Sequence, residues 1–377
     1  MRSPFAILCS LTVAASAALI VLLAPMVMQM APPLPGGARL LYQIALLAGA
    51  FYAYFLGSLP LRAQGPLHAA LGAAALLTLP LAGGAVALAV LAANVVLVPR
   101  WFSLARPAEN PWRLIALGLA VGLLALLAEP IFPPSAPAWI FVDGLVIAAG
   151  LVIAWKAKGA PAFVPAPRKT PLTAALVLRW ILLAALPAGL MQSLASVAGV
   201  GATTILALYC GALALAFSGL PEVFVRAMRL FAPLPLIAGG VVLTALFVHA
   251  ASSPAISLAA SALFVVAALA CHCELARQKP DASALSFFVL AVALGAVFGG
   301  FAAELSAEKI AFAVGLVLAG LLVGAQEEHK TLTRRKLRPH VLAVVATLLI
   351  GGALSWPDPA GENADAIGQL RGPLDGN

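Results

Sequence analysis

Charged side chains are scarce in this chain. Asp, Glu, Lys and Arg make up 10% of the 377 residues, against roughly a quarter in a soluble domain, and 63% of the residues are hydrophobic. The mean hydropathy is +1.05. A chain with so little polar surface cannot face water on all sides. Lipid is therefore its expected solvent, and its backbone must satisfy its hydrogen bonds internally.

Other features are also missing. Aromatic residues make up only 7% of the chain, and Val, Ile and Thr do not alternate with polar residues as in a membrane barrel. The four cysteines include no CxxC pair that would indicate a disulfide or zinc framework. No phosphate-loop, nucleophile-elbow, HExxH or dinucleotide motif occurs. The sequence therefore predicts an all-α polytopic integral membrane protein without a metal, a cofactor or a recognised catalytic motif.

The apolar segments predict about 13 transmembrane helices, within a range of 12 to 14. They form a first half (1–155) and a second half (172–355), separated by a Pro-rich connector (156–171) and followed by an acidic tail (356–377) that we expect to be disordered. The expected spans are 5–28, 40–59, 67–79, 85–98, 114–128, 138–155, 172–190, 202–217, 234–250, 257–273, 285–301, 310–325 and 341–354.

The basic residues indicate how the chain is oriented. Of the 22 Lys and Arg residues, only Arg39, Lys309 and Arg371 fall on one side of the expected spans, and Arg179 lies inside a span. All the others lie on the opposite side, which predicts that the N-terminus and the basic loops are cytoplasmic. The net charge of +8 therefore reflects membrane orientation. Nucleic-acid binding is not expected, because no basic face carries interleaved aromatic residues.

Two charged residues are expected within spans. Arg179 should extend to the cytoplasmic surface or find an acidic partner, because a charge in lipid is costly. Asp143 lies in the outer part of the span 138–155. Either both residues reach headgroups, or Arg179 and an acidic group line a cavity for a polar solute. A direct pair with Asp143 would require one span to be shifted or broken, since the two come from opposite boundaries.

Reactive side chains concentrate at the cytoplasmic end of the span 257–273. Cys271 and Glu274 share a helix face, and Glu274 can reach Arg277 one turn later. His272 and Cys273 point elsewhere, and a single helical turn cannot direct four ligands at one metal. One interpretation is a cap and packing site in which a cytoplasmic arginine holds Glu274. The alternative is an interfacial enzyme that uses Cys271, His272 and Glu274.

A ridge of small residues follows in the span 285–301. Ala291, Gly295 and Gly299 are spaced by four, and Gly300 lies beside them. This spacing predicts close approach of another helix, without indicating which one.

Residues 271–280, CHCELARQKP, and the LGAVFGG that follows resemble a Cys-His-Gly-Glu-Leu-Ala signature and its Gly-rich helix. That signature belongs to the membrane part of bacterial spermidine synthase-like transmembrane proteins. Residues 24–56, 98–130 and 178–217 resemble other parts of the same module. Cys273 stands where the family has glycine. Many relatives also carry an aminopropyltransferase-like domain that has no counterpart in this sequence. The resemblance therefore implies a bacterial inner-membrane module, and synthase activity is not carried over from it.

Three functional hypotheses follow. The first is a multi-pass protein that binds or moves a small solute, for example one related to the polyamines. The second is a non-catalytic accessory subunit whose partners would be other membrane subunits or a separately encoded synthase-like protein. The third is the interfacial enzyme. We rank transport or binding slightly above the accessory role, and both above the enzyme.

Overall fold

The computed structural model describes residues 4–29, 37–56, 111–128, 172–248, 253–280, 284–306 and 308–325, with six single positions between 144 and 155. All of them belong to one compact unit, Met1–Gln326. Across these ranges the chain is helical and no strand occurs, which confirms the predicted all-α class.

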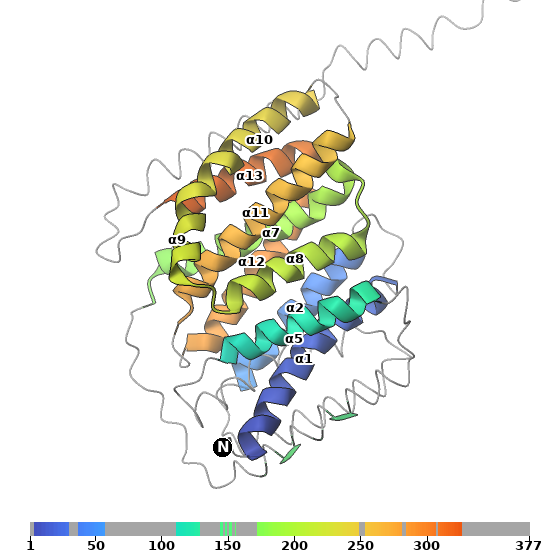
Figure 1. Cartoon of the computed structure of the whole chain (residues 1–377), viewed down its shortest axis with the longest axis vertical. Coiled ribbons are helices and arrows are strands. Elements are labelled where there is room, and N and C mark those ends of the chain that lie inside the picture. Colours follow the sequence, from blue (N-terminus) through green and yellow to red (C-terminus); the bar gives the residue numbers. More distant parts are fainter. Residues whose placement is uncertain are drawn as a thin grey trace, which may run out of the picture. The chain divides into compact units, whose positions relative to one another are not determined.

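Ten helices are described over these ranges (Figure 1). Most coincide with expected spans. The expected spans 67–79, 85–98 and 341–354 lie outside the described residues, and 138–155 is described only at single positions, so the count of about 13 stays a prediction. The helices are α1 (Pro4–Gln29), α2 (Gly37–Leu56), α5 (Pro111–Ala128), α7 (Ala174–Ala198), α8 (Ala202–Phe217), α9 (Glu222–Phe231), α10 (Pro233–Val248), α11 (Pro254–Gln278), α12 (Leu285–Glu304) and α13 (Glu308–Gly324).

Helix α7 is longer than the expected span 172–190. The Thr173 side chain caps its first turn, and the helix continues through Pro187 to Gly199, whose φ of 62° ends it. The polar residues of the last turns do not stop the helix, because their hydroxyl groups find acceptors within it. For example, the Ser193 hydroxyl donates to the Gly189 carbonyl at 3.2 Å.

Helix α9 replaces an expected basic loop. Its ten residues place Glu222, Arg226 and Arg229 along one side, and Arg226 donates to Glu222 at 3.2 Å. The apolar residues occupy the remaining sides, and no residue of α9 is buried. The spacing of four and then three between these polar residues therefore indicates a short amphipathic helix rather than a loop.

Helix α11 extends beyond the expected span 257–273 at both ends. The Ser253 hydroxyl accepts a hydrogen bond from the Ile256 amide and Pro254 occupies the first turn, an arrangement typical of a helix start. The helix ends only before Lys279. Residues 271–274 therefore lie in the last two turns of α11, with Arg277 and Gln278 following them.

Several neighbouring helices run in opposite directions. Trp112 at the start of α5 contacts Phe217 at the end of α8, and Tyr54 near the end of α2 contacts Phe287 at the start of α12. Helices α7 and α11 are likewise antiparallel, because Arg179 in the first turns of α7 meets Glu274 in the last turns of α11. One end of the bundle thus collects a set of basic residues. We call it the basic end; it holds Arg113, Arg179, Arg229, Arg277 and Lys279.

The surface of the described helices is apolar. Large side chains such as Leu124 (66% exposed), Leu258 (73%) and Phe55 (66%) point outwards, while Trp180 and Phe264 are fully buried. Four described helical segments are long and apolar enough to cross a membrane: Ala174–Ala198, Glu222–Val248, Pro254–Gln278 and Phe287–Glu304. The chain is therefore a multi-pass membrane protein in contact with the lipid bilayer.

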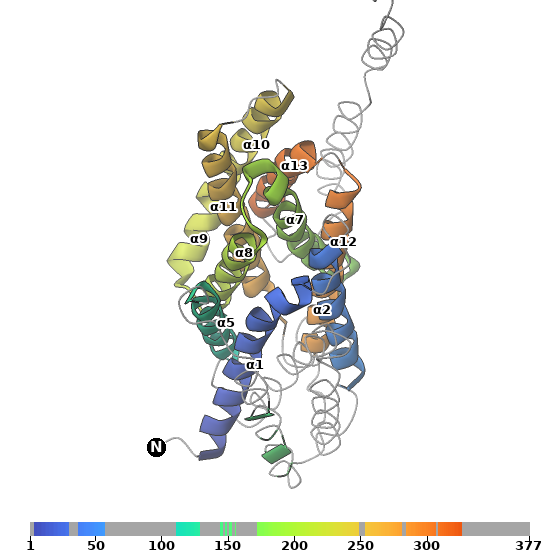
Figure 2. The same ribbon diagram turned by 90° about the vertical axis from the view of Figure 1, so that its right-hand side faces the viewer.

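Glycines bring two helix pairs into close contact (Figure 2). A Cβ on Gly295 or Gly299 of α12 would overlap the carbonyl oxygens of Ile181 and Ala185 in α7. The predicted close approach at this ridge is thus present, and α7 of the same chain occupies it. Ala291 and Gly300 are buried beside it.

Helices α1 and α5 form an equivalent pair. A Cβ on Gly118 would overlap the Ala14 carbonyl oxygen, and one on Gly122 would lie 2.6 Å from the Ala18 carbonyl oxygen. In the first half, Gly118 and Gly122 of α5 therefore lie against two carbonyls of α1 that are one turn apart. In the second half, Gly295 and Gly299 of α12 lie in the same way against two carbonyls of α7. Such contacts require that no side chain separates the two backbones.

The same order appears in the contacts between the halves. Helix α2 packs on α12, and α5 packs on α8. If the expected spans 67–79 and 85–98 count as the third and fourth, α5 is the fifth span of the first half and α12 the fifth of the second. The second helix of each half then contacts the fifth helix of the other. Such an exchange is what two halves of similar architecture would show, and the division into two halves stays a prediction.

Candidate functional site

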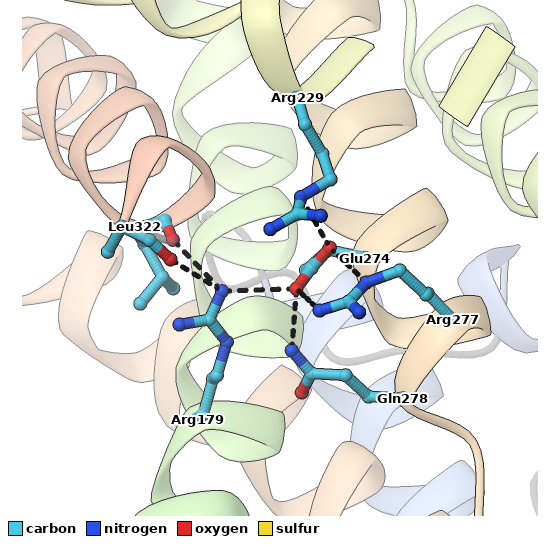
Figure 3. A network of polar contacts seen from close by, with 7 residues as sticks. Arg179, Arg229, Glu274, Arg277, Gln278 and Leu322 are labelled. Carbon is cyan, nitrogen blue, oxygen red and sulfur yellow. Dashed lines mark hydrogen bonds and ion pairs between the residues drawn. The ribbon is translucent and has the colours of Figure 1, made fainter. Parts of the chain in front are cut away.

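A buried ionic cluster connects three helices at the basic end (Figure 3). We call it the Glu274 cluster; it comprises Arg179 from α7, Arg229 from α9, and Glu274, Arg277 and Gln278 from α11. The Glu274 side chain is 0% exposed and the Arg179 side chain 6%. The extra turn of α11 creates the cluster, because it supplies Arg277 and Gln278 beyond the buried glutamate.

The Glu274 carboxylate accepts hydrogen bonds on both oxygens. Its Oε1 accepts from Arg179 at 3.1 Å, Arg277 at 2.7 Å and Gln278 at 2.7 Å. Its Oε2 accepts from the Arg277 Nε at 3.0 Å. The Arg229 Nε lies 3.5 Å from Oε2, close enough for an ion pair but without a hydrogen bond. The carboxylate is therefore fully engaged, and Arg229 is the guanidinium held least tightly to it.

Arg179 also binds the end of α13. Its Nη2 lies 3.4 Å from the Leu322 carbonyl oxygen and 3.2 Å from the Ala325 carbonyl oxygen. The last carbonyls of a helix have no partners within the helix and carry partial negative charge, so a cation there is favourable. Arg179 thereby joins α7, α11 and α13 at one point. Of the two alternatives expected for Arg179, an extension to the surface or an acidic partner, the structure has a partner in Glu274.

The cluster holds three guanidinium groups and one carboxylate. Removing one partner from a buried ion pair leaves an uncompensated charge, which is strongly destabilising. Arg179 and Glu274 therefore depend on each other. Arg229 and Arg277, at 25% and 31% exposed, can still reach water or headgroups.

The other reactive residues of α11 face different neighbours. Cys271 and Cys273 are buried free thiols. The His272 ring lies edge-on to Tyr209 of α8, with 5.1 Å between ring centroids, and its Nδ1 has no hydrogen-bond partner. Within the described ranges, no group of three or more His, Cys, Asp and Glu residues could hold a metal ion. Glu274 is engaged by arginines and the His272 ring faces Tyr209, so an interfacial enzyme that uses Cys271, His272 and Glu274 stays a prediction.

Asp143 lies outside the described residues, and its proposed role as a partner in a solute cavity stays a prediction. Another outer acidic residue is described, because Glu304 of α12 accepts from the Gln192 side chain of α7 at 2.7 Å. Helix α7 is thus linked to α11 at the basic end and to α12 near the opposite end.

Aromatic side chains close the contact between the halves at the basic end. The Trp112 ring of α5 lies 5.1 Å from Phe217 and 6.3 Å from Phe288, between ring centroids, and Phe288 lies 5.0 Å from Trp180. The Lys279 Nζ lies 5.9 Å from the Trp112 centroid. The sequence did not predict this aromatic contact, because the only indication of it was that these residues lie at the ends of expected spans.

Lys279 lies just beyond α11 and is half-buried in this contact. Burial, and secondarily the Arg113 guanidinium, lowers the pKa of the Lys279 ammonium. Arg113 contacts the turn between α8 and α9: a Cβ on Gly219, whose φ is 88°, would lie 2.9 Å from the Arg113 Nε. Two cations from different halves thus lie close enough for the charge of one to act on the other.

Comparison with solved structures finds three transporters, of which one exceeds a TM-score of 0.5. The human organic anion transporter MFSD10 (TETRAN) matches with a TM-score of 0.55 and 14% identity, over 85% of this chain and 100% of that chain. The xylose transporter XylE from E. coli matches with 0.47 and 15% identity, over 87% and 98%. The E. coli fucose:proton symporter FucP matches with 0.45 and 13% identity, over 86% and 100%.

No protein-family model matches the chain, and no curated protein matches it. At 14% identity the similarity to MFSD10 shows the fold alone: the chain has an all-helical fold similar to that of this transporter.

Proposed function

We propose that this protein moves a small solute across the membrane by alternating access, with its two halves rocking against each other. The observation that carries the proposal is the exchange of contacts between the halves, α2 with α12 and α5 with α8. Repeated halves that meet along such seams are typical of secondary transporters. The fold shared with MFSD10 supports the same function.

The glycine contacts fit this motion. The pairs α1–α5 and α7–α12 each meet backbone to backbone within one half, so each pair should move as a rigid unit. The contacts between halves at the basic end involve side chains instead, such as Trp112 with Phe217 and Tyr54 with Phe287. Side-chain contacts can separate without disturbing a helix backbone, so the halves can part along them.

The Glu274 cluster supports the second half. All its members lie on α7, α9 and α11, and Arg179 adds the end of α13. Because every one of these helices belongs to the second half, the cluster holds that half together at the basic end. We assign it a structural role in transport rather than direct contact with solute.

The solute is proposed only by class. An organic anion, a sugar and a polyamine are the classes to test, the last because of the resemblance to spermidine synthase-like membrane modules, which stays a prediction. Of the described acidic residues, Glu274 and Glu304 already accept hydrogen bonds from neighbouring side chains. A cationic solute would therefore depend on acidic groups elsewhere, such as Asp143.

Cross-linking across the halves tests the proposal. Tyr54→Cys with Phe287→Cys, in a chain whose native cysteines are replaced by alanine, places thiols on α2 and α12, where the parent rings lie 6.3 Å apart. Proteoliposomes would be offered a panel of organic anions, sugars and polyamines, and uptake would be followed by mass spectrometry. We expect a short bifunctional thiol reagent to abolish uptake of whichever solute the uncross-linked protein accumulates.

The matched control cross-links two helices of one half. Phe247→Cys with Lys309→Cys joins α10 to α13, where the Lys309 Nζ lies 5.9 Å from the Phe247 ring centroid. This link should leave uptake unchanged, because these helices move together. The proposal fails if no solute class is accumulated, or if both cross-links affect uptake equally.

The accessory-subunit hypothesis receives less support. The Gly295 and Gly299 ridge, which the sequence offered to a partner helix, is already occupied by α7. A complex with other subunits that survives gentle detergent extraction would revive this alternative.

A further inference from the structure

Helix α9 is held to the bundle by few contacts and exposes apolar side chains. Val223 is 80% exposed, Phe231 73% and Leu230 57%, and Glu222, Arg226 and Arg229 lie along a neighbouring side. Only Ala232 separates α9 from α10, and the two together make up the candidate span Glu222–Val248. A short helix with charged residues along one side, at the start of such a segment, is typical of a helix at the membrane surface with apolar side chains among the lipid chains.

Arg229 lies on the polar side of this helix with its charge only partly compensated. The carboxylate that it approaches, Glu274, already accepts hydrogen bonds from Arg179, Arg277 and Gln278. The Arg229 Nε is 3.5 Å from that carboxylate and makes no hydrogen bond. Three guanidinium groups therefore share the single carboxylate of Glu274 (Figure 3).

We propose that Arg229 and the adjoining Glu274 cluster bind the headgroup of an anionic phospholipid from the leaflet at the basic end. The phosphate supplies a second negative charge, and the planar guanidinium of Arg229 can donate two parallel hydrogen bonds to it. The exposed Val223, Leu230 and Phe231 lie beside the acyl chains of the same lipid. A lipid fits better than a soluble anion, because α9 offers its apolar side and its cation together. Basic groups next to membrane spans bind anionic headgroups in this way.

The full chain in nanodiscs or detergent tests this site through lipid binding, independently of transport. Phosphatidylglycerol and phosphatidylcholine vesicles or micelles would be compared by thermal unfolding, and retained lipid would be measured by native mass spectrometry. We expect phosphatidylglycerol to raise the Tm and to remain bound, and phosphatidylcholine to do neither. Arg229→Gln should weaken phosphatidylglycerol binding about fivefold, the effect of one basic residue at a membrane surface.

Arg226→Gln is the matched control, because it removes the same charge from the same helix at a residue that is 71% exposed and paired with Glu222. It should leave binding unchanged. The site is refuted if the two phospholipids bind alike, if both variants lose binding equally, or if inorganic phosphate reproduces the Tm shift. The comparison of lipids on the unmodified chain decides the question even if Arg229→Gln does not fold.

Discussion

The residue on which the basic end depends is Glu274. It is fully buried, and the Arg179 guanidinium that it binds is 6% exposed. A buried pair of this kind is not itself strong proof of added stability, since desolvation offsets much of the attraction. What the geometry does establish is mutual dependence: neither charge can be left alone inside the helix bundle.

Replacing Glu274 alone should therefore be more harmful than replacing both partners. We expect Glu274→Met to destabilise the chain by about 3 to 5 kcal/mol, because Arg179 is left buried without its carboxylate. The double variant Arg179→Met with Glu274→Met should recover part of this loss. Thermal unfolding in detergent measures both.

Glu222→Met serves as the control, since Glu222 is 86% exposed and its pair with Arg226 lies at the surface. Its Tm should match that of the unmodified chain. A double variant less stable than Glu274→Met would contradict the mutual dependence of Arg179 and Glu274.

At the scale of the helices, the close packing of α7 with α12 and of α1 with α5 depends on glycines, which have no side chain. Gly295 and Gly299 let α12 contact the carbonyls of α7, and Gly118 lets α5 contact a carbonyl of α1. In lipid there is no hydrophobic force between helices, so dispersion and close fit decide which helices associate. A single added side chain at these positions must therefore push the backbones apart.

Gly299→Val is the sharpest test of this packing. We expect a loss of about 1 to 3 kcal/mol from overpacking, seen as a lower Tm and as aggregation on size-exclusion chromatography. The control is Gly201→Ser, because Gly201 has a φ of −62° and open space around its Cβ position, and serine is a good cap for α8. Equal stability of the two variants would refute the role of the ridge.

Most helices could be predicted from the sequence, because an apolar run in lipid must become a helix to satisfy its backbone. The contact between Glu274 and Arg277 was also predictable from their spacing of three. The bond between Arg179 and Glu274 was not, because it joins residues 95 positions apart and depends on which helices become neighbours. Helix α9 was missed for a different reason: its charges were interpreted only as a mark of orientation.

For the whole molecule, the principal feature is the aromatic contact between the halves at the basic end. Trp112 meets Phe217 and Phe288 there, and Lys279 lies over its ring. These side chains fill the contact between α5 and the second half at the basic end. Under the proposed function, its separation is a required step.

Trp112→Ala should shift the equilibrium between the two arrangements of the halves. Spin labels at Pro4→Cys in α1 and Glu222→Cys in α9 would report the distance across the basic end by electron double resonance, with the native cysteines replaced by alanine. We expect the variant to populate longer distances. Phe264→Leu, a core change within α11, should leave the distribution unchanged, and an unaltered distribution in Trp112→Ala would argue against a sealing role.

Helix α7 is fastened twice, by Arg179 to α11 and by Gln192 to α12. Pro187 lies between these two attachments and lacks the amide proton that would complete the helix ladder. A helix that is attached at two points cannot rotate about its own axis. It can still bend where a backbone hydrogen bond is missing, so strain along α7 should appear as a bend at Pro187.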